Sequence, residues 1–132
     1  MEQIIEVNVP APVVPSGKRK GQVITLNNLS RIHCAALSKA KNQFKQALQG
    51  WFLPRNEGEA YQSLIIVIRP LRHTRMRYDV SNTSLAVKWL EDSLTDLGWV
   101  DDDCRNTIIL EPAEYVEGLN ETMLKIRVKG KR

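Results

Sequence analysis

The chain has 132 residues, of which 42% are hydrophobic and 26% charged, and it carries a net charge of +4. This composition is ordinary for a globular protein, and the length predicts a single domain over residues 1–132 that buries roughly two thirds of its surface. No apolar run approaches the ~20 residues of a membrane span, and no basic-then-apolar segment opens the chain, so neither a membrane protein nor an export signal is expected.

The N-terminal segment predicts a strand followed by an irregular basic loop. Apolar and polar residues alternate over residues 2–9, and Pro10 ends the pattern. The next stretch, P-A-P-V-V-P-S-G-K-R-K-G, carries three prolines and two glycines, which exclude regular structure. Its tip holds a basic cluster: Lys18, Arg19 and Lys20. Residues 23–26 are expected either to form a short strand or to lead into a helix.

A long helix is predicted from a cap at Asn27 or Asn28 to about Leu48, with Gly50 as its stop. Apolar residues at helical spacing define its buried face: Leu29, Leu37, Ala40, Phe44 and Leu48. Three lysines on or near the opposite side are expected to be solvated, with phosphate contact as the alternative: Lys39, Lys41 and Lys45. His33 falls on the apolar side, where a hydrogen-bonded core histidine is favoured over a catalytic one.

The clearest strand is predicted over residues 61–69, after a turn-rich connection at 51–60. Its five consecutive aliphatic residues, Leu64 to Ile68, favour a strand that is covered on both faces. Pro70 is expected to end it, and an arginine-rich loop follows.

A second helix is predicted from a cap at Ser81 or Asn82 to Leu97, with Gly98 as its stop. Its core stripe consists of four residues at helical spacing: Ala86, Leu90, Leu94 and Leu97. Lys88 and Asp92 share another face, and a surface salt bridge worth a few tenths of a kcal/mol is expected between them. Trp89 is expected either in a dimer contact or in the core.

The C-terminal third predicts two strands separated by a turn. R-N-T-I-I-L forms the first, the turn contains Gly118 and Asn120, and T-M-L-K-I-R-V-K alternates as the second. The resulting β-α-β-α-β-β order defines an α+β domain with one mixed sheet and two packed helices.

Charge is distributed unevenly along the chain. Cations gather at the tip of the first loop, in the arginine-rich loop (Arg69, Arg72, Arg75 and Arg77) and over residues 125–132, while acids concentrate between Asp79 and Glu121. Such segregation favours a nucleic-acid partner, with the cations holding its backbone phosphates; a solvated mixed surface is the alternative. Cys34 and Cys104 have no metal-site spacing, so free thiols in a reducing compartment are expected.

Carboxylates flank the second predicted helix. Asp79 lies before it, and Asp101, Asp102 and Asp103 follow it. If the adjoining strands lie side by side, these acids are expected to converge at one edge of the sheet, where they could bind Mg²⁺. Lys88 would project toward that edge and stabilise charge on a phosphate. A solvated turn is the alternative for three aspartates in a row.

The stretch from Arg77 to Asp103 resembles the RusA-type Holliday junction resolvases. The family pattern is an arginine-rich approach, D-x-D-N, a lysine on a helix that ends in D-A-L, then a glycine and a D-D pair. R-Y-D-V-S-N places Asp79 and Asn82 on the first part, K-W-L-E-D-S-L places Lys88 on the lysine, and L-G-W-V-D-D-D places Asp102 and Asp103 on the pair.

This resemblance implies a small homodimeric, magnesium-dependent endonuclease that acts on branched DNA in recombination and repair. It also implies a phage or prophage origin and a location in the bacterial cytoplasm. Asp79, Lys88 and Asp103 would be catalytic, with Mg²⁺ held by Asp79, Asp102 and Asp103. A symmetric dimer would match the two-fold symmetry of a four-way junction.

The chain departs from the family pattern at two places. Ser81 occupies the second acidic position, which leaves Asp92 and Asp101 as candidates for an additional metal ligand. About three extra residues separate Asn82 from Lys88, close to one helical turn. Because Ser81 weakens the metal site, the alternative function is a branched-DNA-binding protein of the same fold that does not cleave. A basic interaction domain is a further alternative.

Overall fold

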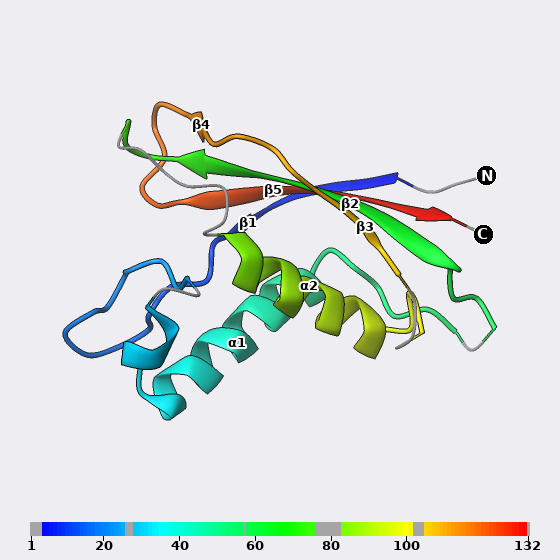
Figure 1. Ribbon diagram of the computed structural model, residues 1–132, viewed down its shortest axis with the longest axis horizontal. Helices are drawn as coiled ribbons and strands as arrows, with labels where there is room; N and C mark the ends of the chain where they lie inside the picture. Colours follow the sequence, from blue (N-terminus) through cyan, green and yellow to red (C-terminus); the bar gives the residue numbers. More distant parts are fainter. Residues whose placement is uncertain (1–3, 26–27, 57, 76–82, 102–104, 132) are drawn as a thin grey trace.

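One mixed sheet carries two helices on a single face (Figure 1). The computed structural model describes residues 4–25, 28–56, 58–75, 83–101 and 105–131. The strands are β1 (Ile4–Pro10), β2 (Ser63–Arg72), β3 (Thr107–Leu110), β4 (Glu114–Tyr115) and β5 (Met123–Lys131). The helical elements are a 3₁₀ turn, η1 (Leu29–Arg31), and the helices α1 (Cys34–Gln49) and α2 (Ser84–Asp96).

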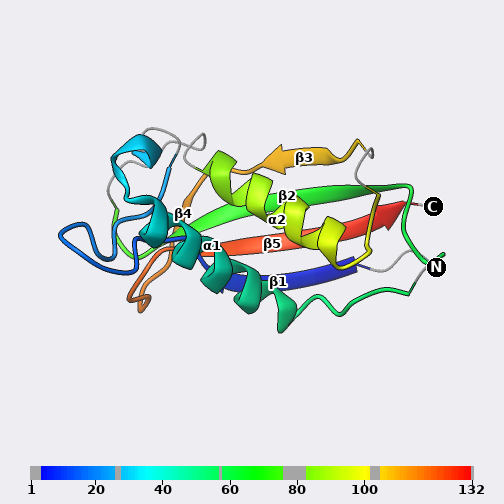
Figure 2. The ribbon, with the colours of Figure 1, turned by 90° about the horizontal axis from the view of Figure 1, so that it is seen from below.

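The strands are ordered β1-β5-β2-β3, and β4 pairs with β2 beyond the end of β3. β5 is antiparallel to both of its neighbours, whereas β3 and β4 run parallel to β2. α1 and α2 lie side by side over one face of the sheet, as the view from below shows (Figure 2), and no described helix covers the other face (Figure 1). The predicted α+β architecture, with one mixed sheet and two packed helices, is therefore confirmed.

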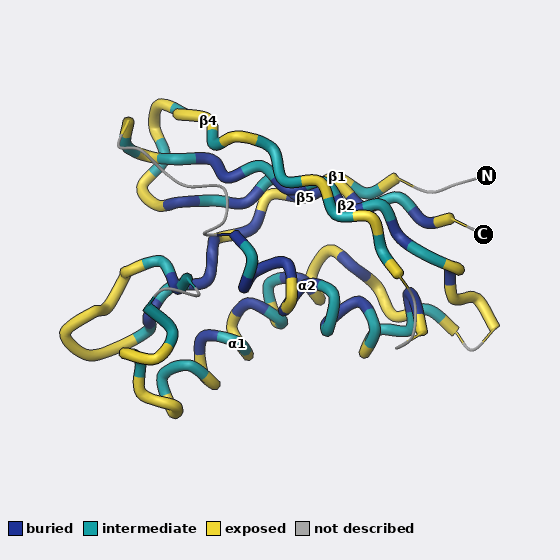
Figure 3. The backbone as a smooth tube through the Cα atoms, in the orientation of Figure 1, coloured by how far each residue is buried: buried dark blue, intermediate teal, exposed yellow. Residues whose placement is uncertain are grey.

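Burial in β2 alternates along the strand, so the predicted coverage of both faces is wrong (Figure 3). Leu64, Ile66 and Ile68 point toward the helices and are fully buried. Ile65 and Val67 lie on the open face and are half-buried. Their register partners on β5 are a lysine and an arginine, whose long aliphatic stems can shield apolar neighbours. An unbroken aliphatic run therefore occurs here on a sheet with only one covered face.

Pro70 does not end the strand, because β2 continues to Arg72. The pairing with β3 ends at Ile68, and the pairing with β4 begins at Leu71. Pro70 thus lies where the partner along one edge changes, a position at which a missing backbone N–H is tolerated.

The first long helix begins at Cys34 rather than at Asn27 or Asn28. The side chain of Asn28 instead accepts a hydrogen bond from the Thr25 N–H and donates one to the Val23 carbonyl, so it fastens the preceding loop. His33 is the N-cap of α1, and its Nδ1 accepts from the backbone N–H of Ala35 at 3.1 Å. The expectation of a core histidine is wrong, since His33 is exposed.

The two helices pack through the residues that the helical spacing predicts. Ala40, Phe44 and Leu48 are buried on α1, and Leu90 and Leu94 are fully buried on α2. Of the other predicted positions, three are only partly buried: Leu29, Leu37 and Leu97.

Trp89 belongs to the core, which decides between its two predicted locations. It is 5% exposed, and its ring lies 6.4 Å from that of Phe44 on the other helix. Cys34 is an exposed free thiol, and Cys104 lies outside the described residues.

Candidate functional site

The first loop and the end of β2, which are far apart in the sequence, border a common hollow at one end of the sheet. Residues 21–23, which follow the tip of the first loop, and Arg72 and His73, at the end of β2, line a common hollow of about 710 Å³. Lys18, Arg19 and Lys20 are exposed on the same loop, and none of them forms an ion pair with a described residue. Among the described residues that line the hollow, Arg72 is the one lysine or arginine, and Glu121 is an acid.

The first loop is closed at its base by backbone hydrogen bonds. Val13 and Val23 form an antiparallel bridge at its base. The Val14 N–H donates to the Gln22 carbonyl at 2.9 Å, and the Gly21 N–H donates back to Val14 at 2.8 Å. Gly21 has φ +86°, a left-handed conformation that suits glycine. The loop is thus held by backbone bonds, and its three cationic side chains are not needed to shape it.

The arginines after β2 differ in their environments. Arg72 is partly buried, and its Nη1 donates to Oγ1 of Thr122 at 2.8 Å, so it joins the end of β2 to the segment before β5. Arg75 is exposed, and its guanidinium carbon lies 4.1 Å from the centre of the Tyr115 ring. Arg75 is therefore presented to solvent on an aromatic support, whereas Arg72 has a structural role. Arg77 lies outside the described residues.

Lys88 is exposed on α2 and lines a polar groove of about 410 Å³. The groove contains three lysines, three carboxylates and two further polar residues: Lys41, Lys45, Lys88, Glu91, Asp92, Thr95, Asp96 and Asn106. Its formal charges balance.

The predicted Lys88–Asp92 ion pair is wrong. Asp92 pairs with Lys41 of α1 at 3.8 Å, and Lys45 of α1 pairs with Asp96 at 2.9 Å. These two lysines were expected on the solvated side of α1, but they cross to α2 and link the helices. Lys88 itself forms no ion pair with a described residue.

The two acidic segments adjoin opposite ends of α2. β2 and β3 lie side by side, as the convergence of the acids requires, but they are parallel. α2 therefore runs back along the sheet, from its N-cap Thr83 toward Asp101 beyond its other end (Figure 2). Its 13 residues span about 20 Å. Asp79, Asp102 and Asp103 lie outside the described residues, so their convergence stays a prediction.

The chain just before Asp101 is anchored through Gly98 and Trp99. The Trp99 Nε1 donates to the Leu53 carbonyl at 2.8 Å, and the backbone N–H of Arg55 donates to Leu97 at 2.8 Å. Gly98 has φ +80°, and a Cβ there would lie 2.9 Å from the Arg55 carbonyl oxygen. Only glycine fits both requirements, so the G-W part of the motif positions the segment that leads to the acids.

Tyr61 supports this anchor from the other side. Its backbone N–H donates to the Trp99 carbonyl at 2.8 Å, and its ring is 4% exposed between Trp99 and the Arg55 guanidinium. The ring occupies the space above Gly130 of β5, where a Cβ would meet three ring atoms at 2.3–2.5 Å. The glycine thus leaves room for an aromatic side chain that packs against Trp99.

Asp101 is exposed and forms no ion pair with a described residue, so its carboxylate is available to a cation. The other candidate for an additional ligand, Asp92, is engaged by Lys41. Within the described part of the chain, no three His, Cys, Asp or Glu side chains form a metal-binding group. Carboxylate oxygens are the donors that Mg²⁺ prefers, so Asp101 fits this ion in its chemistry.

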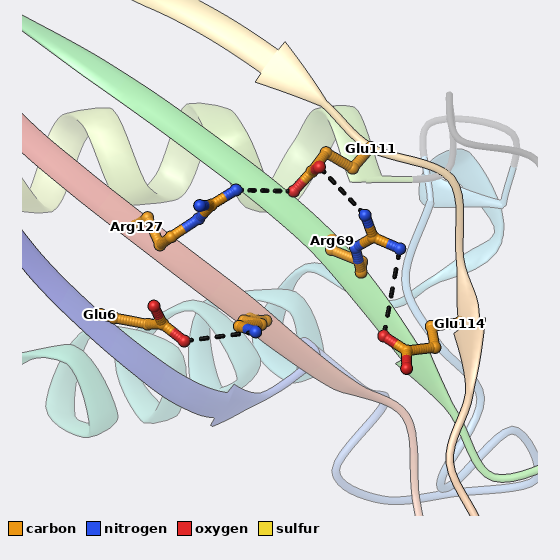
Figure 4. Close-up of polar contacts among 6 residues, drawn as sticks. Glu6, Arg69, Glu111, Glu114 and Arg127 are labelled. Carbon is orange, nitrogen blue, oxygen red and sulfur yellow. Dashed lines mark hydrogen bonds and ion pairs between the residues drawn. The ribbon is translucent and has the colours of Figure 1, made fainter.

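The open face of the sheet carries an ion-pair network that the sequence pattern did not predict (Figure 4). Glu111 accepts from Arg69 and from Arg127, each at 3.0 Å, and Glu114 lies 4.0 Å from Arg69. The hydrogen bond from Arg69, together with the charges of both arginines, lowers the pKa of Glu111 below its ordinary value. Of the cations predicted over residues 125–132, four belong to β5, and part of their charge is neutralised on this face: Lys125, Arg127, Lys129 and Lys131. Arg132 lies outside the described residues. The alternation within β5 places Arg127 on this face, but its pairing with Glu111 depends on the register of the sheet, which the local pattern does not contain.

No protein-family model matches the chain, and no curated protein matches it either. Among the described residues, no helix has both the length and the apolar character needed to span a bilayer.

Proposed function

We propose that this protein is a magnesium-dependent endonuclease that cleaves branched DNA such as Holliday junctions. The observation that carries the proposal is a set of exposed cations that form no ion pair with a described residue: Lys18, Arg19, Lys20 and Arg75. Arg75 follows the end of β2, from which the chain leads to Asp79. Exposed cations without acidic partners favour a polyanion that is held through its phosphates.

Each group of side chains has a separate role in this proposal. Lys18–Lys20, Arg75 and Arg77 hold the DNA backbone, while Arg72 fixes the end of β2. Asp79, Asp102 and Asp103 hold Mg²⁺, with Asp101 better placed than Asp92 as a further ligand because its carboxylate is unpaired among the described residues. When bound, Mg²⁺ supplies an activated water and neutralises charge on the scissile phosphate.

Lys88 acts on the phosphate rather than within an ion pair. Its ammonium group is exposed on α2, whereas the other two lysines of the same groove are engaged by Asp92 and Asp96. A cation that is not already neutralised can stabilise developing negative charge. A symmetric homodimer would supply two such sites for paired cuts in a four-way junction.

The second candidate is a branched-DNA-binding protein that does not cleave. One observation favours it: the described flanks of the two acidic segments adjoin opposite ends of α2, about 20 Å apart. A metal site within one chain requires residues 76–82 and 102–104 to bring their acids across that distance. Ser81, in place of an acid, also favours this candidate.

Cleavage of a synthetic four-way junction with and without Mg²⁺ tests the proposal. We expect Mg²⁺-dependent cutting by the natural protein, and its loss in Asp79→Asn and Asp103→Asn with binding largely retained. Glu117→Gln is the matched control, because Glu117 is an exposed turn residue outside the proposed site. Cutting at the natural rate by either aspartate variant would refute the metal assignment. Tight binding with no cutting at any Mg²⁺ concentration would favour the second candidate.

A further inference from the structure

A small hollow separates the tip of the first loop from η1 and the beginning of α1. Its volume is about 230 Å³, below the roughly 300 Å³ at which pockets for drug-sized ligands begin. The lining residues come from two segments: Val14, Ser16, Gly17, Lys18 and Arg19, and Arg31, Ile32, His33 and Ala36. A site of this size suits a single small group rather than a whole organic ligand.

The charge of this hollow is uncompensated. Lys18, Arg19 and Arg31 line it, all three are exposed, and no carboxylate is among the lining residues. None of the three cations forms an ion pair with a described residue. The groove around Lys88 contrasts with it, since three carboxylates balance three lysines there. Like charges held around one small space favour an anion that bridges them.

Backbone bonds hold Arg31 in place relative to the loop. The Arg31 N–H donates to the Asn28 carbonyl at 3.0 Å, and the Asn28 side chain bonds both Val23 and Thr25 at the base of the loop. Across the hollow, the Lys20 N–H donates to the Gly17 carbonyl and closes the turn at the tip. The two walls are therefore ordered before any ligand binds, which reduces the entropic cost of binding.

We infer that this hollow binds one backbone phosphate of the nucleic acid, and that Arg31 is a phosphate-binding residue together with Lys18 and Arg19. This inference rests on the proposed function for the source of the phosphate. It extends the DNA contact from the end of β2 across the first loop to η1. Arg31 has no place in the family motif, so the assignment depends only on the geometry of this chain.

Two measurements test the inference on the whole protein. The first follows backbone amide shifts by NMR while inorganic phosphate is added at constant ionic strength. We expect shifts around Gly17–Arg19 and Arg31–His33, retained in Arg31→Lys and lost in Arg31→Gln. The second measures affinity for a synthetic four-way junction at several salt concentrations, without Mg²⁺. Loss of one phosphate contact lowers the log–log salt slope by about 0.9, so Arg31→Gln is expected to bind several-fold more weakly with a slope about one unit smaller.

Lys131→Gln is the matched control, because Lys131 is an exposed cation at the far end of β5, paired in register with the start of β2. An equal loss of slope in Lys131→Gln would overturn the inference, since any surface charge would then suffice. Phosphate shifts located elsewhere would also overturn it. Shifts at the hollow with an unchanged slope in Arg31→Gln would assign the site to free phosphate and refute the nucleic-acid contact. Absence of cleavage with both expected results intact would refute the endonuclease and leave this site standing.

Discussion

Replacing Gly130 with alanine is expected to destabilise the protein, although the same substitution in an ordinary strand stabilises it by about 0.5–1 kcal/mol. The added Cβ would lie 2.3–2.5 Å from three ring atoms of Tyr61, far inside contact distance. Gly130 is paired with Leu64 of β2, and the preceding residue, Lys129, is paired with both Ile4 of β1 and Ile65 of β2, so the backbone at this point cannot move away without cost. The buried Tyr61 ring must therefore shift from its place against Trp99.

The magnitude follows from the two ways in which the clash can relax. Overpacking that the surroundings absorb costs about 1–3 kcal/mol, whereas complete loss of a buried aromatic side chain costs about 3–5 kcal/mol. We expect a loss of about 2–4 kcal/mol for Gly130→Ala, or a fall in melting temperature of about 4 °C for each kcal/mol. Urea denaturation measures the free energy of unfolding, with an unchanged m value as the check on two-state behaviour.

A double-mutant cycle with Tyr61→Ala isolates the cause. Tyr61→Ala alone is expected to cost about 3–5 kcal/mol. In that background the ring is absent, so Gly130→Ala should become neutral or stabilising by up to about 1 kcal/mol, and the sign of its effect reverses. The same destabilisation by Gly130→Ala in both backgrounds would refute the packing argument, because the cost would then arise from the strand itself.

Three further outcomes are expected. The triple substitution of Lys18, Arg19 and Lys20 by glutamine should leave the fold unaltered. It should lower the slope of log affinity against log salt concentration for junction binding by about 2.7, from about 0.9 for each cation removed. A slope within about 0.5 of the natural one would exclude the loop from the DNA contact. Ser81→Asp should lower the Mg²⁺ concentration for half-maximal cleavage if the serine marks a missing ligand, and an unchanged or higher requirement would show that another acid fills that position. Glu111→Gln should destabilise the protein at neutral pH, because a carboxyl whose pKa is lower in the folded than in the unfolded state stabilises the fold above the ordinary pKa of 4.5. This contribution is lost as the pH falls from 4.5 through the folded-state pKa, so the difference in thermal unfolding between the variant and the natural protein should shrink over that range. A difference that stays constant with pH would show that the charge of Glu111 is not its cause.

Local sequence patterns predicted the elements whose structure depends on nearby residues. The helical spacing identified the buried faces of α1 and α2, and alternation identified β1 and β5. His33 shows the limit of this reasoning, because its place on the apolar side of the spacing assumed that the helix had already begun. The side chain of Asn28 bonds the preceding loop instead, and the helix starts six residues later, at Cys34.

Features that join distant segments were beyond the reach of local patterns. The partner of Asp92 is on α1, the partners of Glu111 are on β2 and β5, and the reason for Gly130 is a tyrosine before β2. These depend on register and helix crossing, which no short window of sequence contains. One missed feature was predictable from the order of the elements. A helix that connects two neighbouring strands returns the chain to the end of the sheet at which the first strand began, so the two strands are parallel. That rule would have shown that the chain enters α2 near one end of the sheet and leaves it toward the other.

The position of β5 between β1 and β2 has a consequence for synthesis. β1 is synthesised before the other strands, but its only described strand partner is β5, so Ile4 cannot pair until Lys129 has been synthesised. On the ribosome, β2, α2 and β3 can assemble as a local unit, whereas β1 has no strand to pair with until β5 has emerged. The closure of so long a loop is slow compared with local pairing. Insertion of β5 is therefore expected to be the step that joins β1 to the rest of the sheet.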